Sequence, residues 1–293
     1  MPELPEVESV RRQLEPALLG RRFERVEILD SRLVRPYEPA EVAAELERER
    51  VTAVERRGKY LVVRFETGRV LLIHLRMTGS LRHAPGGTLQ DDPHRRAVVR
   101  LDDGSDVAYR DVRRFGTWLL LEPGEAAPYL DARVGIEPLE AIFTAARLAE
   151  RLGRRRAPVK AALLDQRTLA GLGNIYVDEA LWRARINPLR PAESLDRNEL
   201  RRLHRGIRAA LEHGIARQGS TLRDYALPDG GSGTMQDEFR VYGRGGEPCD
   251  RCGTPIAKTR VAGRGTWFCP ACQRQAASSS SSRPSRSRRQ SSV

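Results

Sequence analysis

The chain has 293 residues, of which 40% are hydrophobic, and a formal net charge of +12. No stretch approaches the roughly 20 apolar residues of a membrane-spanning helix, and the first residues, MPELPEVESV, lack the basic start and apolar run of a secretory signal. The composition argues against a membrane protein or an exported one and favours a basic protein that binds a polyanion, nucleic acid above all.

The first part of the chain predicts one helix followed by a β-rich domain. Residues 5–19 carry apolar side chains at steps of three and four, which is typical of an amphipathic helix. Between 22 and 121, short β-rich runs alternate with turn signals, so we expect an antiparallel sandwich or barrel, interrupted by one helix over 39–49. The clearest runs are Val51–Val54, Tyr60–Phe65, Val70–Leu75, Ala97–Leu101 and Thr117–Leu121.

The second part predicts helices, a loop and a small cysteine module. Spacing is helical over 140–217, and Asp196 with Glu199 forms a capping-box start for the helix over 195–216. Residues 218–240 are Gly-rich and polar and predict a mobile loop. The Ser/Arg tail has nothing to bury, so we expect it to be disordered. The predicted domains are a β-sandwich over 1–133, a helical domain over 134–240, a zinc finger over 241–275 and the tail over 276–293.

All four cysteines lie in two closely spaced pairs, Cys249-x2-Cys252 and Cys269-x2-Cys272. This spacing is typical of a four-thiolate zinc site, and the alternative, two disulfides, is disfavoured in a reducing cytosol. Four thiolates leave no open coordination position, so we expect one structural Zn²⁺. Between the pairs, residues 258–266 predict a hairpin with a basic tip suited to phosphate contact; the alternative is a solvated basic turn.

Pro2 becomes a secondary amine at the chain end once Met1 is removed. A terminal amine has a pKa of roughly 8, against about 10.4 for lysine, so part of it is nucleophilic at neutral pH. Its attack on a sugar C1′ or an aldehyde would give an iminium, and Glu3 and Glu6 could handle the protons. By themselves these residues favour an ordinary interpretation, because many proteins begin Met-Pro and acidic residues commonly complement a helix dipole.

Seven motifs in order change this balance, because together they resemble bacterial formamidopyrimidine-DNA glycosylases. The resemblance spans about residues 1–275, and the form of residues 2–5, with Leu4 where the endonuclease VIII branch usually has Gly, is similar to the oxidised-purine branch. The motifs are MPELPEVE at 1–8, RRGKYL at 56–61, HLRMTG at 74–79, YRDVRRFG at 109–116, LDQ at 164–166, GLGNIY at 171–176 and VYGR at 241–244, followed by the cysteine module.

The resemblance implies an α+β fold: an N-terminal β-sandwich with flanking helices, a helix–two-turn–helix domain and a C-terminal zinc-finger hairpin, with DNA in the cleft between domains. It implies a bifunctional DNA glycosylase and AP lyase of base-excision repair. Such an enzyme excises oxidised purines (8-oxoguanine, formamidopyrimidines) through an N-terminal proline Schiff base and then cuts the strand by β,δ-elimination. Enzymes that cut this bond take the nucleotide out of the stack.

The resemblance also implies roles for individual residues. Pro2 is the nucleophile and Glu3 the proton donor, and the catalytic set further contains Lys59, Glu6 and Arg264. Met77, Arg113 and Phe115 fill the hole left by the extruded base, His74, Asn174 and Arg264 bind phosphates, His94 contacts DNA, and the loop Gly219–Phe239 caps the flipped base.

Ordinary structural roles are the alternatives. They are core packing for Met77, Phe115 and His74, a surface ion pair for Arg113, and a surface position for Lys59. Asn174 follows glycines at the start of an apolar helix and is expected to cap it, with or without a phosphate.

One departure concerns His94-Arg95-Arg96, because the family often has a second histidine where this chain has Arg96. Arg96 could still bind a phosphate at this position. The partner expected is damaged double-stranded DNA, with no membrane, for a monomer in the cytoplasm that joins the nucleoid when bound. Two other functions compete: an endonuclease VIII-like glycosylase for oxidised pyrimidines, and a zinc-ribbon DNA-binding protein without chemistry.

Overall fold

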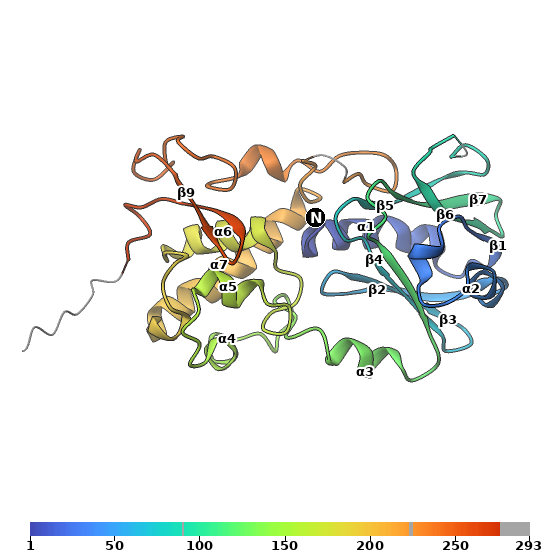
Figure 1. Cartoon of the computed structure of the whole chain (residues 1–293), viewed down its shortest axis with the longest axis horizontal. Helices are drawn as coiled ribbons and strands as arrows, with labels where there is room; N and C mark the ends of the chain where they lie inside the picture. The colour runs from blue at the N-terminus through green and yellow to red at the C-terminus, as the bar shows by residue number, and fades with distance from the viewer. Residues whose placement is uncertain (90, 223–224, 276–293) are drawn as a thin grey trace, which may run out of the picture.

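The computed structural model describes residues 1–89, 91–222 and 225–275. Within these ranges the chain forms a β-rich half and a helical half, and the N-terminus lies between them (Figure 1). The tail over 276–293, for which disorder is expected, lies outside the described residues. Among the helices of the described part, none has the length and apolar character to cross a membrane.

The β-rich half consists of two four-stranded sheets in which all neighbouring strands are antiparallel. Helices α1 (Leu4–Leu18) and α2 (Pro39–Leu46) and the 3-10 turn η1 (Ser31–Val34) accompany the sheets. One sheet has the order β1 (Phe23–Ile28), β6 (Arg95–Leu101), β7 (Ser105–Asp111) and β5 (Gly79–Pro85); the other has β2 (Val51–Arg57), β3 (Tyr60–Phe65), β4 (Val70–His74) and β8 (Thr117–Leu121). The predicted α+β class with an N-terminal β-sandwich is confirmed.

The predicted helix over 39–49 is too long by three residues, because α2 ends at Leu46. Arg48 adopts a left-handed backbone with φ 69°, and its N–H donates to the carbonyl of Phe23. Tertiary pairing with β1 therefore takes over where the helical pattern would continue.

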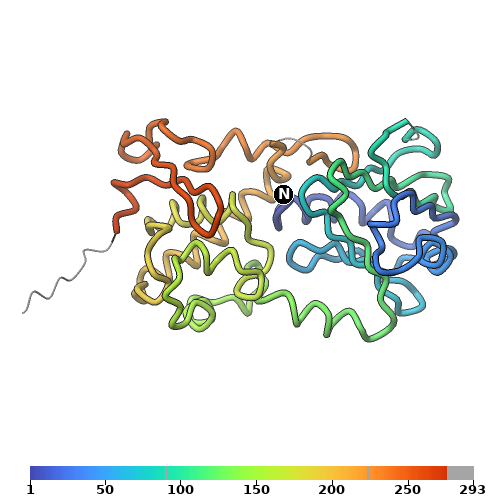
Figure 2. The backbone as a smooth tube through the Cα atoms, viewed as in Figure 1, coloured from blue at the N-terminus to red at the C-terminus, as the bar shows by residue number. Residues whose placement is uncertain are grey.

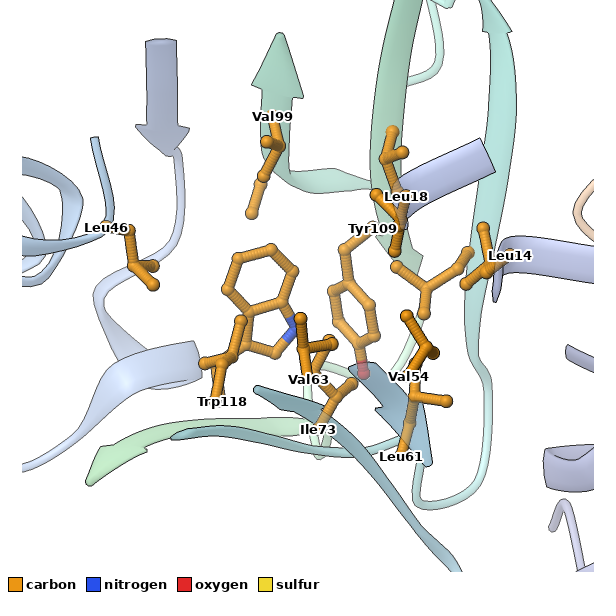
Figure 3. Close-up of a cluster of buried hydrophobic side chains, with 14 of the residues drawn as sticks. Leu14, Leu18, Leu46, Val54, Leu61, Val63, Ile73, Val99, Tyr109 and Trp118 are labelled. Carbon is orange, nitrogen blue, oxygen red and sulfur yellow. The ribbon is translucent and has the colours of Figure 1, made fainter. Parts of the chain in front are cut away.

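The core of the sandwich is apolar because alternate strand residues from both sheets face each other across it. Figure 3 shows Tyr109 and Trp118 at its centre, surrounded by aliphatic side chains from both sheets and from α1. Their ring centroids are 5.8 Å apart in an edge-to-face arrangement, which adds about 0.5–1.5 kcal/mol to the burial itself.

The helical half is built around the crossing of two helices. Its helices are α4 (Ala145–Leu152), α5 (Val159–Leu164), α6 (Asn174–Ala184) and α7 (Arg197–Ala216), with the 3-10 turns η2 (Ala192–Ser194) and η3 (Met235–Glu238). Helix α3 (Ala126–Asp131), in the linker after β8, packs instead on the sheet that contains β3, β4 and β8. Helix α7 begins with the predicted capping box of Asp196 and Glu199. Where α7 crosses α6, a Cβ on Gly206 would lie 2.8 Å from the carbonyl oxygen of Ala180, so only glycine permits this close approach.

The zinc-finger hairpin, β9 (Ala257–Val261) and β10 (Arg264–Phe268), packs against α6. Trp182 of α6 joins a small apolar cluster with Ile256 and Cys269, and the guanidinium of Arg251 lies 3.6 Å from the centroid of its indole ring. The hairpin is thereby fixed to the helical half.

The loop predicted over 218–240 is largely packed in its described part. Tyr225 and Leu227 are buried in the core of the β-sandwich, and the carbonyl of Pro228 accepts a 2.9 Å hydrogen bond from the N–H of His83. Met235 is buried in the helical core. Figure 2 shows that this segment crosses back to the β-rich half, opposite the linker that follows β8. The two halves are therefore connected twice.

Candidate active site

A cavity of about 380 Å³ lies where the N-terminus meets both halves of the molecule. Five parts of the chain form its walls: the start of the chain, the loop after β4, the loop after β7, the first turn of α6, and the segment after α7. The lining residues are Met1, Pro2, Glu6, Met77, Thr78, Arg113, Ile175, Ser220, Leu222, Tyr225 and Tyr242. The chain end is thus held inside a site large enough for a small ligand or a single base.

Glu3 joins the two halves at this cavity. It is the N-cap of α1, and its side chain and that of Glu6 form a capping box. Its carboxylate also accepts hydrogen bonds from the backbone N–H groups of Ile175 (2.9 Å) and Tyr176 (3.3 Å) in the first turn of α6. A Cβ on Gly173 would lie 2.3 Å from the carboxyl carbon of Glu3, so glycine is required there.

The prediction that Asn174 caps α6 is wrong. The N-cap position belongs to Gly173, and Asn174 is the first helical residue. Its side-chain amide donates to the carbonyl of Gly265 at the zinc-finger hairpin. The carboxylate of Glu3, more than 170 residues away in sequence, satisfies the helix instead.

Lys59 is buried at the hairpin between β2 and β3, with a side chain directed at the same region. Its ammonium donates a 2.8 Å hydrogen bond to the carbonyl of Leu172, and the residue is 5% exposed, which excludes the surface alternative. Burial lowers the pKa of Lys59, and the carboxylates of Glu3 and Glu6 partly oppose this. Burial also raises the pKa of Glu3, which Lys59 partly offsets. A carboxyl with a raised pKa suits proton donation.

Glu6 is held by donors from three parts of the chain. One carboxylate oxygen accepts the hydroxyl of Tyr176 and the backbone N–H of Ser220, both at 2.8 Å, and the other accepts the N–H of Glu3 at 2.8 Å. Simple helix-dipole complementation would not need these partners. Glu6 therefore orients the N-terminus against α6 and against the segment that follows α7.

Three residues project from the β-rich half beside the cavity. Met77 lies in the turn after β4, and Arg113 and Phe115 lie in the loop after β7; Met77 and Arg113 line the cavity. Phe115 is 52% exposed, so the core alternative fails for it. Arg113 lies 4.8 Å from the Phe115 ring centroid, and among the described residues it forms no ion pair. We call Met77, Arg113 and Phe115 the wedge.

His74 is buried at the end of β4. Its Nδ1 accepts the N–H of Arg76 at 3.0 Å, and its ring packs edge-to-face on Tyr60. Burial, reinforced by Arg76 and Lys59, lowers the pKa of His74 to about 3. The ring is therefore neutral, and its remaining proton is on Nε2. His74 is thus both a packed residue and a potential neutral donor.

His94 and Arg264 do not line the cavity. Arg264 is exposed at the zinc-finger hairpin, close enough to Lys59 to lower the pKa of that residue. His94 is partly buried before β6, where its Nδ1 lies 3.4 Å from Arg96. The Nε of Arg96 donates to the carbonyl of Asp111, so much of the guanidinium already serves the loop beside the wedge.

The four cysteine side chains converge on one point. Their sulfurs all lie within 4.8 Å of one another, and the Cys252 and Cys269 sulfurs are 3.5 Å apart, much longer than the roughly 2.05 Å of a disulfide bond. The N–H groups of Cys252 and Gly253 donate to the carbonyl of Cys249 and form a tight knuckle. Four convergent thiolates fit one structural zinc ion, as predicted, and leave it no open position.

Sequence reasoning missed the residues that hold Glu6. Tyr176 lies inside a recognised motif but carried no predicted role. Ser220 and Tyr225 lie in a segment without periodicity, and Tyr225 donates to the backbone carbonyl of Glu6 at 3.1 Å. The signal that the sequence offered was an aromatic residue, Tyr225, in a stretch otherwise rich in Gly, Pro and Asp.

Comparisons with known proteins agree along most of the chain. Models of the formamidopyrimidine-DNA glycosylase N-terminal domain, the formamidopyrimidine-DNA glycosylase H2TH domain and a zinc finger found in FPG and IleRS match residues 1–118, 134–226 and 246–275. A relative from Roseiflexus sp. (strain RS-1), named formamidopyrimidine-DNA glycosylase, is 50% identical over 276 residues, covering 94% of this chain and 100% of the relative.

Two solved structures from Lactococcus lactis are also similar. One is an FPG variant in complex with a Fapy-dG containing DNA, with a TM-score of 0.87 and 39% identity. The other is the wild-type FPG with an oxidized pyrimidine containing DNA, with a TM-score of 0.86 and 38% identity. Each match covers 94% of this chain and 100% of the other chain.

Proposed function

Since this chain belongs to the formamidopyrimidine-DNA glycosylase family, we propose that it excises oxidised purines from duplex DNA and then cuts the strand. The observation that carries this proposal is the position of Pro2. It lines the cavity between the two halves, next to a buried Glu3 whose carboxylate meets the first turn of α6. Removal of Met1 would leave a terminal amine at this cavity, with the Glu3 carboxyl beside it as the proton donor.

The proposed reaction begins when the Pro2 nitrogen, freed by removal of Met1, attacks C1′ of the damaged nucleotide. The bond from C1′ to the base breaks, and the base leaves with its electron pair and takes up the proton that the Pro2 nitrogen gives up. Glu3, whose pKa is raised by burial, gives its proton to the sugar ring oxygen as the ring opens. The amides of Ile175 and Tyr176 then stabilise the carboxylate that remains.

The iminium formed at Pro2 makes the C2′ protons acidic, so loss of one of them expels the 3′ phosphate. A second elimination expels the 5′ phosphate, and water hydrolyses the iminium to release the enzyme. We assign Lys59 a supporting catalytic role at the reacting sugar, because its ammonium is buried beside Glu3 and its pKa is lowered. Glu6 orients the amine through its hydrogen bond from the N–H of Glu3.

The proposed DNA-binding residues surround the cavity. The wedge replaces the extruded base in the stack, and the segment Gly219–Phe239 covers the flipped base. His74, through its Nε2 proton, and Arg264, at the hairpin tip, bind phosphates near the lesion. Asn174, beside the hairpin, serves the same purpose, and His94 contacts the backbone beyond the cavity. We propose that the enzyme acts as a monomer in the cytoplasm, on chromosomal DNA.

A second substrate class is supported by one observation. The Lactococcus lactis relative was solved with an oxidized pyrimidine containing DNA, so oxidised pyrimidines are candidate substrates too. Leu4 favours purines by resemblance, and it is fully buried against Gly171, where a Cβ would lie 2.6 Å from the Leu4 side chain. A zinc-ribbon protein without chemistry is inconsistent with membership of this enzyme family.

The test of the proposed function combines a lesion panel with borohydride trapping. Duplexes that carry 8-oxoguanine, a formamidopyrimidine or an oxidised pyrimidine are incubated with the protein and borohydride. We expect covalent trapping and the fastest excision with the two purine lesions. Absence of a cross-link on every lesion would overturn the mechanism, and faster excision of the pyrimidine would reverse the substrate assignment.

The first prediction concerns the electrostatic part of DNA binding. Because the chain carries a net charge of +12, affinity for undamaged duplex is expected to fall steeply with salt as counterions are released. Arg264→Ala should weaken binding to every sequence and lower the slope of log K against log salt by about one unit. Filter binding or anisotropy across a salt series measures both. An unchanged slope would remove Arg264 from the phosphate contacts.

The second prediction concerns the wedge. Phe115→Ala removes an exposed ring from the loop after β7, so base extrusion should slow by about tenfold or more, since partial unstacking costs a few kcal/mol. Cleavage of a preformed abasic site should change little, because no base has to leave the stack. Single-turnover kinetics on the two substrates gives the ratio. Equal losses on both would point to a folding defect instead.

A further inference from the structure

The wedge residues come from two separate loops, yet the structure holds these loops as one unit. Met77 follows β4, whereas Arg113 and Phe115 follow β7. The two loops meet where β5 begins and β7 ends, at the paired residues Gly79 and Asp111. Their relative position decides whether three side chains can enter a DNA stack together.

The side chain of Asp111 is the hub between these loops. One carboxylate oxygen accepts the hydroxyl of Thr78, from the Met77 loop, and the N–H of Arg113 at 3.2 Å. The other accepts the N–H of Gly116 at 2.7 Å. The Thr78 hydroxyl in turn accepts the N–H of Arg113 at 3.0 Å. One carboxylate and one hydroxyl thus bind both loops on either side of Phe115.

Burial makes this hub more than a surface contact. Asp111 is 1% exposed and Thr78 is 6% exposed, and among the described residues no cation forms an ion pair with the Asp111 carboxylate. A buried carboxylate without a counter-ion is costly unless its oxygens are satisfied by well-placed donors. Those donors here all belong to the two wedge loops.

The hydroxyl of Tyr109 lies close to the glycines at the base of both loops, Gly79 and Gly116. A Cβ on Gly79 would lie 2.3 Å from the Tyr109 hydroxyl, and a Cβ on Gly116 would lie 1.6 Å from it. Glycine is therefore required at the base of both loops, which rest on one buried ring. That ring is fixed in turn against Trp118 in the sandwich core (Figure 3).

We propose that Asp111 and Thr78 are positioning residues that brace the two wedge loops, so that Met77, Arg113 and Phe115 insert into DNA as one rigid unit. The proposal rests on the proposed function, because it assigns the brace to base extrusion. Neither residue takes part in bond breaking. Misplacing a reacting or inserting group by about 1 Å can cost about a hundredfold in rate, so a brace on three inserting side chains has a measurable effect.

Asp111→Asn tests the brace, because its amide would set N–H groups against donors that now point at oxygens. We expect single-turnover excision of 8-oxoguanine to slow by about tenfold, while a preformed abasic site is cut within about threefold of the wild-type rate. Asp106→Asn is the matched control. Asp106 lies on the same strand with 4% exposure, and it binds the N–H of Gly87 and the side chain of Arg100, away from the wedge. This control should excise at the wild-type rate.

A pair of variants at Thr78 covers the case in which Asp111→Asn folds poorly. Thr78→Val keeps the shape but removes the hydroxyl, and should slow extrusion as Asp111→Asn does. Thr78→Ser restores the hydroxyl and should recover most of the rate. The insertion step itself is followed by stopped-flow fluorescence of 2-aminopurine placed beside the lesion.

The outcomes separate the inference from the function beneath it. Wild-type protein that forms no borohydride cross-link would contradict the proposed function. If the wild-type protein is active, two results would overturn the brace and leave the proposed function intact. One is that Thr78→Val and Thr78→Ser excise the lesion at equal rates. The other is that Asp111→Asn is slowed by the same factor on lesion DNA and on abasic DNA.

Discussion

Any N-terminal extension that keeps Pro2 inside the chain is expected to abolish both base excision and strand cleavage. The reason is chemical, because Pro2 is nucleophilic only as a terminal secondary amine, and an extension turns its nitrogen, at the wall of the cavity, into an amide. The measurement is cleavage of an 8-oxoguanine duplex, together with borohydride trapping. Treating a Met1-retaining protein with methionine aminopeptidase should restore both activities and serves as the control.

Two substitutions refine this result. Pro2→Gly leaves a primary terminal amine that still forms an imine, so weak lyase activity should remain while most glycosylase activity is lost. Glu3→Gln keeps the shape but cannot donate a proton, so base excision should suffer more than cleavage of a preformed abasic site. Peptide mapping of the trapped complex locates the reacting amine. A cross-link on Lys59, or full activity in the extended protein, would remove Pro2 from the mechanism.

The second large effect is expected from Cys269→Ser. Each of the four thiolates completes the tetrahedron, so the variant should lose the zinc ion. Cys269 is also fully buried against Ile256, so the hairpin that carries Arg264 should unfold and DNA affinity should fall by roughly a hundredfold or more, since zinc binding free energy is folding free energy for such modules. Metal analysis, DNA titration and circular dichroism are the measurements.

The β-sandwich should survive this change, because its core is separate from the cluster around the cysteines. Chelator treatment of wild-type protein, followed by zinc addition, provides a reversible control for the substitution. If carefully reduced wild-type protein contained no zinc, or if Cys269→Ser bound DNA with wild-type affinity, the structural role of the metal would be wrong.

The sequence alone determined the features that depend on local spacing. Strands β2, β3, β4, β6 and β8 of the sandwich follow from their β-rich runs, and the capping box of Asp196 and Glu199 follows from their spacing of three residues. The zinc site follows from the spacing of two cysteine pairs, whose four sulfurs converge in the structure. Seven motifs in one order also placed the chain in its family. These features can be predicted from the sequence because each motif is contained within a few residues.

Only the tertiary structure decided which distant groups complete the site. Asn174 had a plausible local role as a helix cap, yet Glu3 takes that role from across the domain boundary. Lys59 has buried surroundings and a lowered pKa that no neighbouring residue in the sequence indicates, and the pKa of His74, in a run for which core packing was an alternative, is lowered in part by Lys59 from another segment. Because these effects depend on hydrogen-bond partners and burial supplied by segments far along the chain, no periodic pattern in the sequence carries them.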